Sequence, residues 1–475
     1  MLVPFAEWRP DVAMLNSQYA ADVKNVLCAS ASYVPFRTFL MGGGSALSTA
    51  PISGFTARRG PQYYMFMGTS AKLFMNDGSG TWNDVTKTAT SYAATATARW
   101  DFAQFGNYVI AVNPNNKPQV YELGVSTRFT DLGGNPPQAK AVEVWGDFLA
   151  LLGVTPNNMN RVHWSALNDI TGWTAGTNNS DYQDFPDGGE VMGSSSSTNP
   201  TIILESAIYM GAFVPGSTEV FTFRKVHEKV GALSPYSIAS RGALTFFLNG
   251  NGSFVIAPDG ALRQIGLERV DRSVFSVPDG ALTREQQRGA TGIVDTSFSR
   301  VYWAVDKGAN SRFTDLYIYD WDLDKWTRAS IDHAVLFATV PLGFASSPSA
   351  MTLGAMRFTT GVGYHHGTFD GSILAEATLQ TAEFGDTSGG VSRITEWQPV
   401  VDADDLTDLT VAVGSRMRRS DAVTWGTGFK PSSNTGIARS RSRARYHSVK
   451  LTIAQGAEWT HAQGVDINPA SAGRR

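Results

Sequence analysis

Residues 300–305, Arg-Val-Tyr-Trp-Ala-Val, form an apolar run that is followed by a second run at 316–321, Leu-Tyr-Ile-Tyr-Asp-Trp, and then by Trp326. Both runs are rich in β-branched and aromatic residues, and the segment between them contains Gly, Asn, Ser and Asp. This pattern is typical of strands joined by a turn. The unit therefore predicts two adjacent β-strands with an aromatic side chain beyond the next turn.

The same unit recurs along the chain. Five further apolar runs match 300–305, and they lie at 63–68, 107–112, 147–152, 201–206 and 244–249. The first residues of the six runs are separated by 44, 40, 54, 43 and 56 residues. Each is followed by a second strand-like run, at 72–77, 119–124, 161–166, 207–212 and 252–257, and in most units by an aromatic residue, as at Trp82, Phe129 and Trp173. A repeat near 40–45 residues with several short strands is typical of a β-propeller. Blades in a ring cover each other's faces, and the aromatic side chains fill the wedges between them. We therefore predict an all-β protein with a β-propeller of about six blades; an irregular β-sandwich with coincidental spacing is the alternative.

The repeat also predicts the domain boundaries. The propeller is expected at 46–343, and the two termini, 1–45 and 396–475, are expected to form a smaller β-sandwich-like platform domain beside it. Residues 344–395 are either a linker or an extra blade: 344–351 is rich in Ser and Pro, and a blade could start at 364–371. Helical periodicity is nearly absent, and the best helix candidate is 18–26.

The composition narrows the class of protein. Of 475 residues, 39 are Lys or Arg and 42 are Asp or Glu, so charged residues make up 17% against a usual ~25%. The 42% hydrophobic content and the 12 Trp exclude a disordered chain. A net charge of −3 argues against a general binder of nucleic acid or anionic membranes.

Cysteine and hydropathy give further limits. The single cysteine, Cys28, excludes an intramolecular disulfide framework and is expected to be a small buried hydrophobe. No apolar run reaches the ~18 residues that cross a bilayer, so no membrane segment is expected. The first residues lack the basic and apolar regions of a secretion signal, and we expect a soluble chain made in the cytoplasm.

The common catalytic motifs are absent. There is no Gly-Lys dipeptide for a phosphate-binding loop, and no Gly-x-Ser-x-Gly segment for a hydrolase nucleophile. His227-Glu228 lacks the second histidine of a zinc-protease helix. None of these motifs therefore predicts a catalytic, cofactor-binding or metal-binding residue; a carboxylate pair across a cleft, as in a glycosidase, is the alternative that the 42 acidic residues leave open.

Three acidic segments are candidate sites for a cation or for catalytic carboxylates. Asp320, Asp322 and Asp324 have the first spacings of a calcium loop, but Lys325 and Ile331 stand where Gly and Glu are needed, so a hairpin turn is expected. The segment 77–82, Asp-Gly-Ser-Gly-Thr-Trp, is similar to the Asp-box turn of sialidase-type propellers but departs from that pattern. The third segment is expected to be a solvated loop and contains Asp402, Asp404, Asp405 and Asp408.

Histidines offer weaker candidates. His365 and His366 are neighbours in a predicted strand and point to opposite faces, so one ion does not bind both, and surface positions are expected for them. His163 stands between Val162 and Trp164, where a core or interface position with a satisfied ring nitrogen is expected.

Basic residues gather in three places. The smaller groups are Arg58 with Arg59, and Arg416 with Arg418 and Arg419. The largest group alternates with Ser and Ala, so that in a strand its guanidinium groups would line one face; it consists of Arg439, Arg441, Arg443 and Arg445. Such a row suits carboxylates or phosphates. We predict a protein interface, with nucleic acid or a solvated face as the alternatives.

Four stretches of the chain resemble a known family. They are, first, 4–8 with Pro10-Asp11, 25–27 and 33–36; second, 161–169 with Trp173 and 181–191; third, 231–235 with 246–248, 259–260 and 265–270; and fourth, 445–447 with 456–466. In order and over most of the chain they resemble the tail nozzle, tail hub or packaged-DNA stabilisation proteins of short-tailed bacteriophages. The match weakens between about 345 and 435, and Cys28 replaces the family's usual proline.

The resemblance implies a structural virion protein without catalytic residues. It implies a propeller with a platform domain, a hexameric ring below the portal and adaptor rings, and a lumen that conducts the genome during ejection and is closed after packaging. Tail fibres or spikes are further possible partners, and the location is the phage tail, assembled in the host cytoplasm. We expect a neutral or mildly acidic lumen that DNA passes without specific binding. The alternative function is a propeller-fold protein that binds or degrades glycans.

Overall fold

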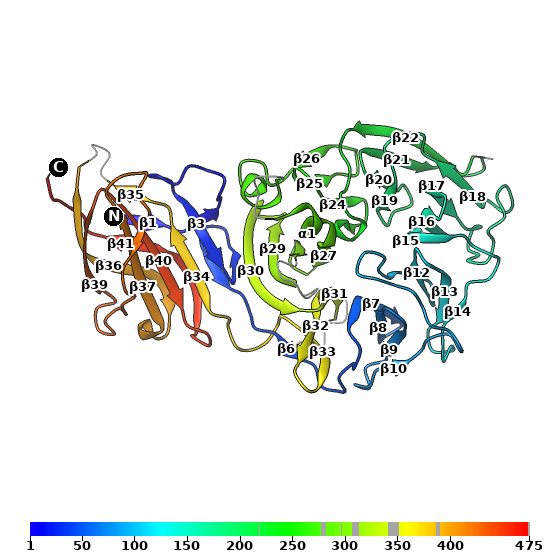
Figure 1. Cartoon of the computed structure of the whole chain (residues 1–475), viewed down its shortest axis with the longest axis horizontal. Helices are drawn as coiled ribbons and strands as arrows, with labels where there is room; N and C mark the ends of the chain where they lie inside the picture. Colours follow the sequence, from blue (N-terminus) through cyan, green and yellow to red (C-terminus); the bar gives the residue numbers. More distant parts are fainter. Residues whose placement is uncertain are drawn as a thin grey trace.

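A ring of sheets and a β-sandwich beside it make up the computed structural model, which describes residues 1–217, 219–276, 282–295, 297–305, 313–340, 351–385 and 390–473 (Figure 1). The described part of the chain contains only four short helical segments: η1 (Pro235–Ser237), η2 (Asp271–Phe275), α1 (Arg284–Gly289) and η3 (Leu406–Asp408). None of them is long and apolar enough to cross a membrane.

Seven four-stranded antiparallel sheets form the blades of a propeller. Blade one consists of β7 (Pro51–Arg59), β8 (Gln62–Thr69), β9 (Leu73–Asn76) and β10 (Asn83–Asp84). Blade two consists of β11 (Asp101–Phe105), β12 (Tyr108–Asn113), β13 (Asn116–Glu122) and β14 (Thr130–Asp131). Blade three consists of β15 (Gln138–Trp145), β16 (Phe148–Thr155), β17 (Asn158–Trp164) and β18 (Asp181–Asp184). Blade four consists of β19 (Val191–Ser194), β20 (Thr201–Leu204), β21 (Ala207–Phe213) and β22 (Phe221–Glu228).

The remaining blades follow the same order except for the last. Blade five consists of β23 (Ala239–Arg241), β24 (Leu244–Asn249), β25 (Gly252–Ile256) and β26 (Leu262–Gln264). Blade six consists of β27 (Thr291–Asp295), β28 (Arg300–Val305), β29 (Phe313–Asp320) and β30 (Lys325–His333). Blade seven consists of β31 (Val335–Thr339), β32 (Thr352–Thr359), β33 (Gly363–Thr368) and, from the N-terminal part of the chain, β6 (Leu40–Met41). An N-terminal strand therefore closes the ring.

The all-β propeller prediction is confirmed, with seven blades instead of about six. The six predicted pairs of runs fall on the second and third strands of blades one to six. Blade seven has no complete unit in the sequence, because its outermost strand precedes its other strands by almost 300 residues. Most of the Ser/Pro-rich segment 344–351 lies outside the described residues.

The platform is a sandwich of two seven-stranded sheets built from both ends of the chain. The first sheet contains β1 (Leu2–Pro4), β4 (Val26–Cys28), β5 (Tyr33–Pro35), β36 (Ser392–Ala403), β39 (Ala438–Ala444), β41 (Trp459–Ile467) and β42 (Ala470–Ser471). The second contains β2 (Ala6–Trp8), β3 (Tyr19–Lys24), β34 (Ala377–Thr381), β35 (Phe384–Gly385), β37 (Leu409–Arg416), β38 (Thr424–Trp425) and β40 (Tyr446–Ile453). Both termini lie in this part of the molecule (Figure 1).

The helix expected at 18–26 is wrong, because this segment forms strand β3. The strand pairs in parallel with β2 and antiparallel with β34, which lies more than 350 residues further along the chain. These two partners satisfy its backbone groups on both sides and outweigh a weak local helix preference. Asn25, with a φ of +57°, then turns the chain out of the strand.

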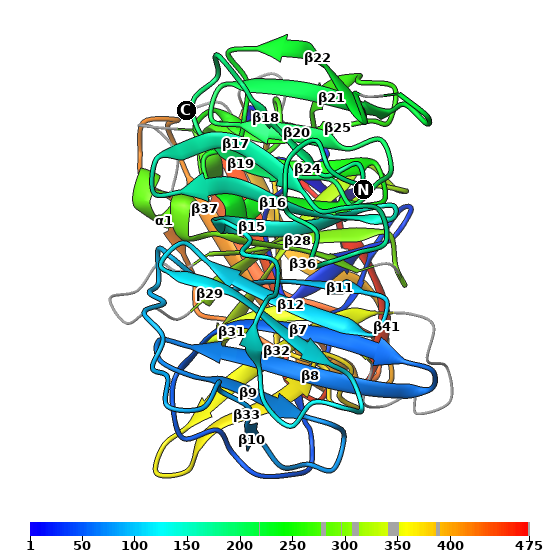
Figure 2. The ribbon, with the colours of Figure 1, turned by 90° about the vertical axis from the view of Figure 1, so that its right-hand side faces the viewer.

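Aromatic side chains fill the wedges between blades, as expected. Phe129 is fully buried and lies against Phe66 of blade one, with ring centroids 5.7 Å apart. Gly68 is needed at the same interface, since a Cβ there would lie 2.3 Å from the ring of Trp100. Figure 2 shows the blades edge-on, stacked side by side around the ring.

One hydrophobic core joins the propeller to the platform. Buried residues of the platform, including Phe5 and Trp8, belong to the same cluster as Trp303 and Trp326 of blade six. Polar contacts follow this boundary, since Arg328 of β30 forms an ion pair of 2.6 Å with Asp22 of β3. The two parts are therefore packed as one body.

Candidate functional site

Three of the four predicted interface arginines form a row on β39. Arg439, Arg441 and Arg443 are exposed and alternate with less exposed or buried residues, so their side chains leave the same face of the sheet. Arg445 lies one residue beyond the strand and is half-buried. The strand is at the margin of the first platform sheet, on the side away from the propeller (Figure 1).

The neighbouring strand β36 adds charges of both signs to this face. Arg393 stands directly opposite Arg443, and Glu396 stands opposite Arg439. The Glu396 carboxylate lies 3.6 Å from the Arg439 guanidinium, but both side chains are largely exposed, so this ion pair contributes little stability. We call the face formed by Arg393, Arg439, Arg441 and Arg443 the arginine face.

The smaller basic groups are mostly engaged within the chain. The Arg59 guanidinium donates to the carbonyl of Leu123 over 2.6 Å, and Arg416 forms an ion pair with Glu383. Arg418 and Arg419 are exposed on the turn after β37.

The acidic segments do not converge on a metal ion. Asp320 and Asp324 flank the hairpin turn between β29 and β30, as expected, and their carboxylates pair with Arg300 and Arg269. Asp77 receives the backbone N–H of Ser79 in a tight turn. In the described ranges no three His, Cys, Asp or Glu side chains are grouped as metal ligands.

The acidic loop after β36 is solvated, as predicted. Asp404 and Asp405 are exposed, as is Asp402 near the end of β36, whereas Asp408 in η3 is half-buried. Asp405 caps η3 by accepting the backbone N–H of Thr407, and Asp402 accepts the hydroxyl of Thr460. The carboxylates of Asp402 and Asp405 thus accept hydrogen bonds from different parts of the chain and do not converge on one site.

The surface position expected for His366 is wrong. His366 is buried rather than on the surface: its ring lies 5.7 Å from the ring of Phe337 in β31, and burial lowers its pKa to about 4. His365 is half-buried. His163 is half-buried against Trp173, with ring centroids 5.5 Å apart, and its Nε2 has no hydrogen-bond partner among the described residues.

Cys28 is a buried hydrophobe, as predicted. Its thiol is 5% exposed and donates to the carbonyl of Trp326. Burial raises its pKa far above the usual value, so the thiol is unreactive at neutral pH.

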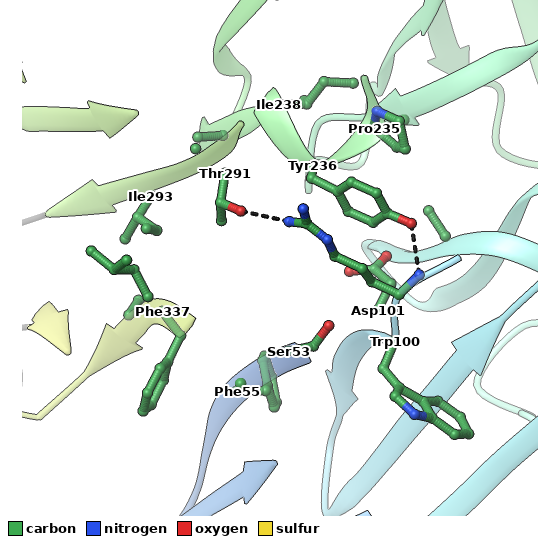
Figure 3. A pocket seen from close by; sticks show the side chains of 18 of the residues that line it. Ser53, Phe55, Trp100, Asp101, Pro235, Tyr236, Ile238, Thr291, Ile293 and Phe337 are labelled. Carbon is green, nitrogen blue, oxygen red and sulfur yellow. Dashed lines mark hydrogen bonds between the residues drawn. The ribbon is translucent and has the colours of Figure 1, made fainter. Parts of the chain in front are cut away.

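Sequence reasoning missed a cavity on the propeller axis. The first strands of all seven blades contribute to its lining, and its volume is about 450 Å³ (Figure 3). Apolar walls come from residues such as Phe55, Ile293 and Phe337, and polar groups from Asp101, Glu143 and others. No local motif signals this cavity, because each blade supplies only one short strand to it.

Arg99, at this cavity, forms hydrogen bonds with residues of distant blades. Its guanidinium donates to the hydroxyl of Thr291 and to the carbonyl of Gly289, both over 2.8 Å. It also lies 4.5 Å from the ring of Tyr236, whose hydroxyl accepts the backbone N–H of Arg99 (Figure 3). The residue therefore links the segment before blade two to blades five and six.

Two carboxyl groups in the cavity are protonated more readily than usual. Burial raises the pKa of Asp101 to about 6. Burial and the charge of Asp101 raise the pKa of Glu143 to about 8. The cavity thus disfavours negative charge at neutral pH.

Replacing Glu143 with Gln is expected to stabilise the protein increasingly as the pH rises above about 4.5. Since the pKa of Glu143 is raised on folding, its protonated form stabilises the fold at low pH, and this stability is lost as the pH rises from about 4.5 to about 8. Glu143→Gln should leave the free energy of unfolding unchanged near pH 4.5 and raise it by about 2 kcal/mol near pH 9. Urea denaturation at both pH values measures this, with the exposed Glu219→Gln as control. Equal effects of Glu143→Gln at the two pH values would contradict it.

Comparisons with known proteins leave the family open. No family model matches the chain, and no curated protein matches it. Among 302 solved chains that match, YCF48 bound to D1 peptide is 11% identical with a TM-score of 0.37, covering 73% of this chain and 94% of that chain. The computationally designed Ika8 protein is 9% identical with a TM-score of 0.35, and the match covers 70% of this chain and 100% of that chain. A chain from an S. cerevisiae assembly of dbp5, nup159 and gle1 is 10% identical with a TM-score of 0.42, and the match covers 75% of this chain and 100% of that chain. Similarities at this level assign no function.

Proposed function

We propose that this chain is a non-catalytic structural protein of a short-tailed bacteriophage, a subunit of the tail nozzle or hub. Six copies would form a ring below the portal and adaptor rings, surround the DNA exit channel and help to retain the packaged genome. The ordered resemblance described above supports this, since its segments fall on both parts of the fold: 161–169 begins on β17 of blade three, and 456–466 ends on β41 of the platform.

The observation that carries the proposal is the joining of two unlike parts into one body. The shared core fixes the platform to blade six, so the two parts keep one relative orientation. A closed ring of identical copies needs head-to-tail contacts between two different faces of each subunit. A propeller rim at one end and a platform sandwich at the other supply two such faces.

The proposed DNA channel would lie between subunits and not along a propeller axis. The axial cavity of about 450 Å³ has the size of a small-molecule pocket. Arg99 also links blades across it. We therefore expect the subunit surfaces that line the ring to be neutral or mildly acidic, and a strongly basic bore in a reconstruction would contradict this.

The proposal is tested by the mass and symmetry of the assembled protein. We expect particles with sixfold symmetry in electron micrographs, either of the purified protein or after mixing with the adaptor ring. A protein that stays monomeric by mass photometry and binds neither the portal nor the adaptor ring would refute it.

A glycan-degrading propeller is the second candidate. The carboxyl pair Asp101 and Glu143 favours it, because glycoside hydrolysis uses one carboxylic acid with a raised pKa beside a second carboxylate. Glycan release from host surface polysaccharide by the wild type, and its loss in Glu143→Gln, would support this candidate over the nozzle.

A further inference from the structure

The arginine face borders a free edge of the platform. Among the described strands, β39 pairs only with β36, so the other side of β39 has no strand partner. Such an edge presents backbone N–H and C=O groups that can pair with an additional strand. This makes β39 a possible acceptor of an extended segment from another molecule.

The side chains on β39 restrict which segment can pair there. Arg439, Arg441 and Arg443 alternate with less exposed residues and stand on one face, and the pairing of β39 with β36 is irregular between Arg439 and Ser442. Arg441 makes no hydrogen bond or ion pair with any described residue. Arg443 stands opposite Arg393, an arrangement that is unfavourable without an anion between the two.

Charge is also concentrated around this strand. Residues 409–450 contain nine Lys or Arg and one Asp, whereas the rest of the chain contains 30 basic and 41 acidic residues. A second β39 would bring like charges together across the edge, and this disfavours self-pairing. A strand with carboxylates at alternate positions would place each of them beside a guanidinium group.

We propose that β39 binds an extended acidic segment of a partner protein by strand addition, with alternate Glu or Asp side chains paired to the arginine face. Backbone hydrogen bonds supply affinity in this mode, and the alternating side chains supply specificity. This inference rests on the proposed function, because the partner that supplies the acidic segment would be another protein of the same virus particle.

A protein strand fits this edge better than nucleic acid. A phosphodiester chain offers no N–H donors to the backbone carbonyls of β39, whereas a peptide pairs with both kinds of backbone group.

Binding of a designed peptide tests the proposal. The probe is a seven-residue peptide that alternates Thr and Glu and matches the length of β39. We expect saturable binding that weakens with salt, and protection of β39 amides from hydrogen exchange. A block isomer, with all Glu residues at one end, and a peptide N-methylated along one edge should each bind about tenfold more weakly or worse.

Substitutions of single arginines test whether the peptide binds at β39. Arg441→Glu should weaken binding of the alternating peptide about tenfold or more, whereas Arg419→Glu, at an exposed position outside β39, should not change it. Unchanged thermal unfolding would show that both variants fold. Equal binding of the N-methylated peptide, or tighter binding of duplex DNA than of the alternating peptide, would overturn the proposal.

The peptide-binding experiment and the ring-assembly experiment can fail independently of each other. Peptide binding by a protein that forms no ring would leave the edge inference standing and refute the nozzle. A sixfold ring whose subunits do not bind the peptide would support the nozzle and refute the edge inference.

Discussion

Trp326→Ala is expected to lower the free energy of unfolding by about 3–5 kcal/mol, the largest effect of any single substitution considered. Trp326 is fully buried in blade six and stacks on Trp303, with ring centroids 5.6 Å apart. Its indole N–H donates to the carbonyl of Ile265 in the segment that follows blade five. The substitution leaves a large cavity and an unsatisfied carbonyl at once.

Trp326→Ala should also lower the local stability of the platform, because Trp326 belongs to the hydrophobic core that the propeller and the platform share. The Trp326 carbonyl also accepts the Cys28 thiol from β4. We therefore expect faster hydrogen exchange in β4 as well as in β24 of blade five, together with a lower midpoint of urea unfolding. Trp82→Ala, at a half-buried tryptophan of blade one, is the control and should cost about 1 kcal/mol. Exchange that changes in the blades alone would contradict a shared core.

His333 is expected to make the propeller acid-sensitive. Its ring is buried between Phe39 and Phe369, with centroid distances of 4.7 and 4.9 Å, and its Nε2 has no hydrogen-bond partner in the described ranges. Burial, helped by the charge of Arg357, lowers the pKa of His333 to about 3. Phe39 directly precedes β6, so this contact lies beside the strand that closes the ring.

The direction of the pH effect follows from the lowered pKa. Below pH ~6.5 the unfolded chain binds a proton that the folded protein excludes until about pH 3, so stability falls as the pH drops through this window. Relative to His333→Phe, the wild type should lose about 2–3 kcal/mol between pH 7 and pH 4.5. Denaturation curves at several pH values measure this difference. His461→Phe, at an exposed position, should show no such trend, and parallel curves for wild type and His333→Phe would disprove the assignment.

Much of the propeller could be predicted from the sequence. Residues 300–305 and their five counterparts each became the second strand of a blade, because a strand buried on both faces requires a continuous run of apolar residues. Trp326 and Phe129 also lie in the wedges where the repeat pattern puts aromatic side chains.

Other features depended on long-range partners. Residues 19–24 have a weak helical pattern and became a strand only because β2 and β34 pair with them. The two residues of β6 carry no strand signal, and their place in blade seven follows from pairing with β33. His366 was expected at the surface because nothing local shows that its ring packs against Phe337, almost 30 residues earlier in the chain.

For the arginine face, too, one part was predictable from the sequence and another part depended on the tertiary structure. The alternation of Arg439, Arg441 and Arg443 in the sequence predicted one basic face, because side chains of a strand alternate between its two sides. That this strand lies at a free edge, with Arg393 opposite Arg443, was decided by the order of strands in the platform sheet. The axial cavity and the raised pKa of Glu143 likewise arose only when seven blades closed into a ring. Local periodicity by itself determined the blades and the basic row, whereas ring closure, the platform and the environment of each charge required contacts between residues far apart in the chain.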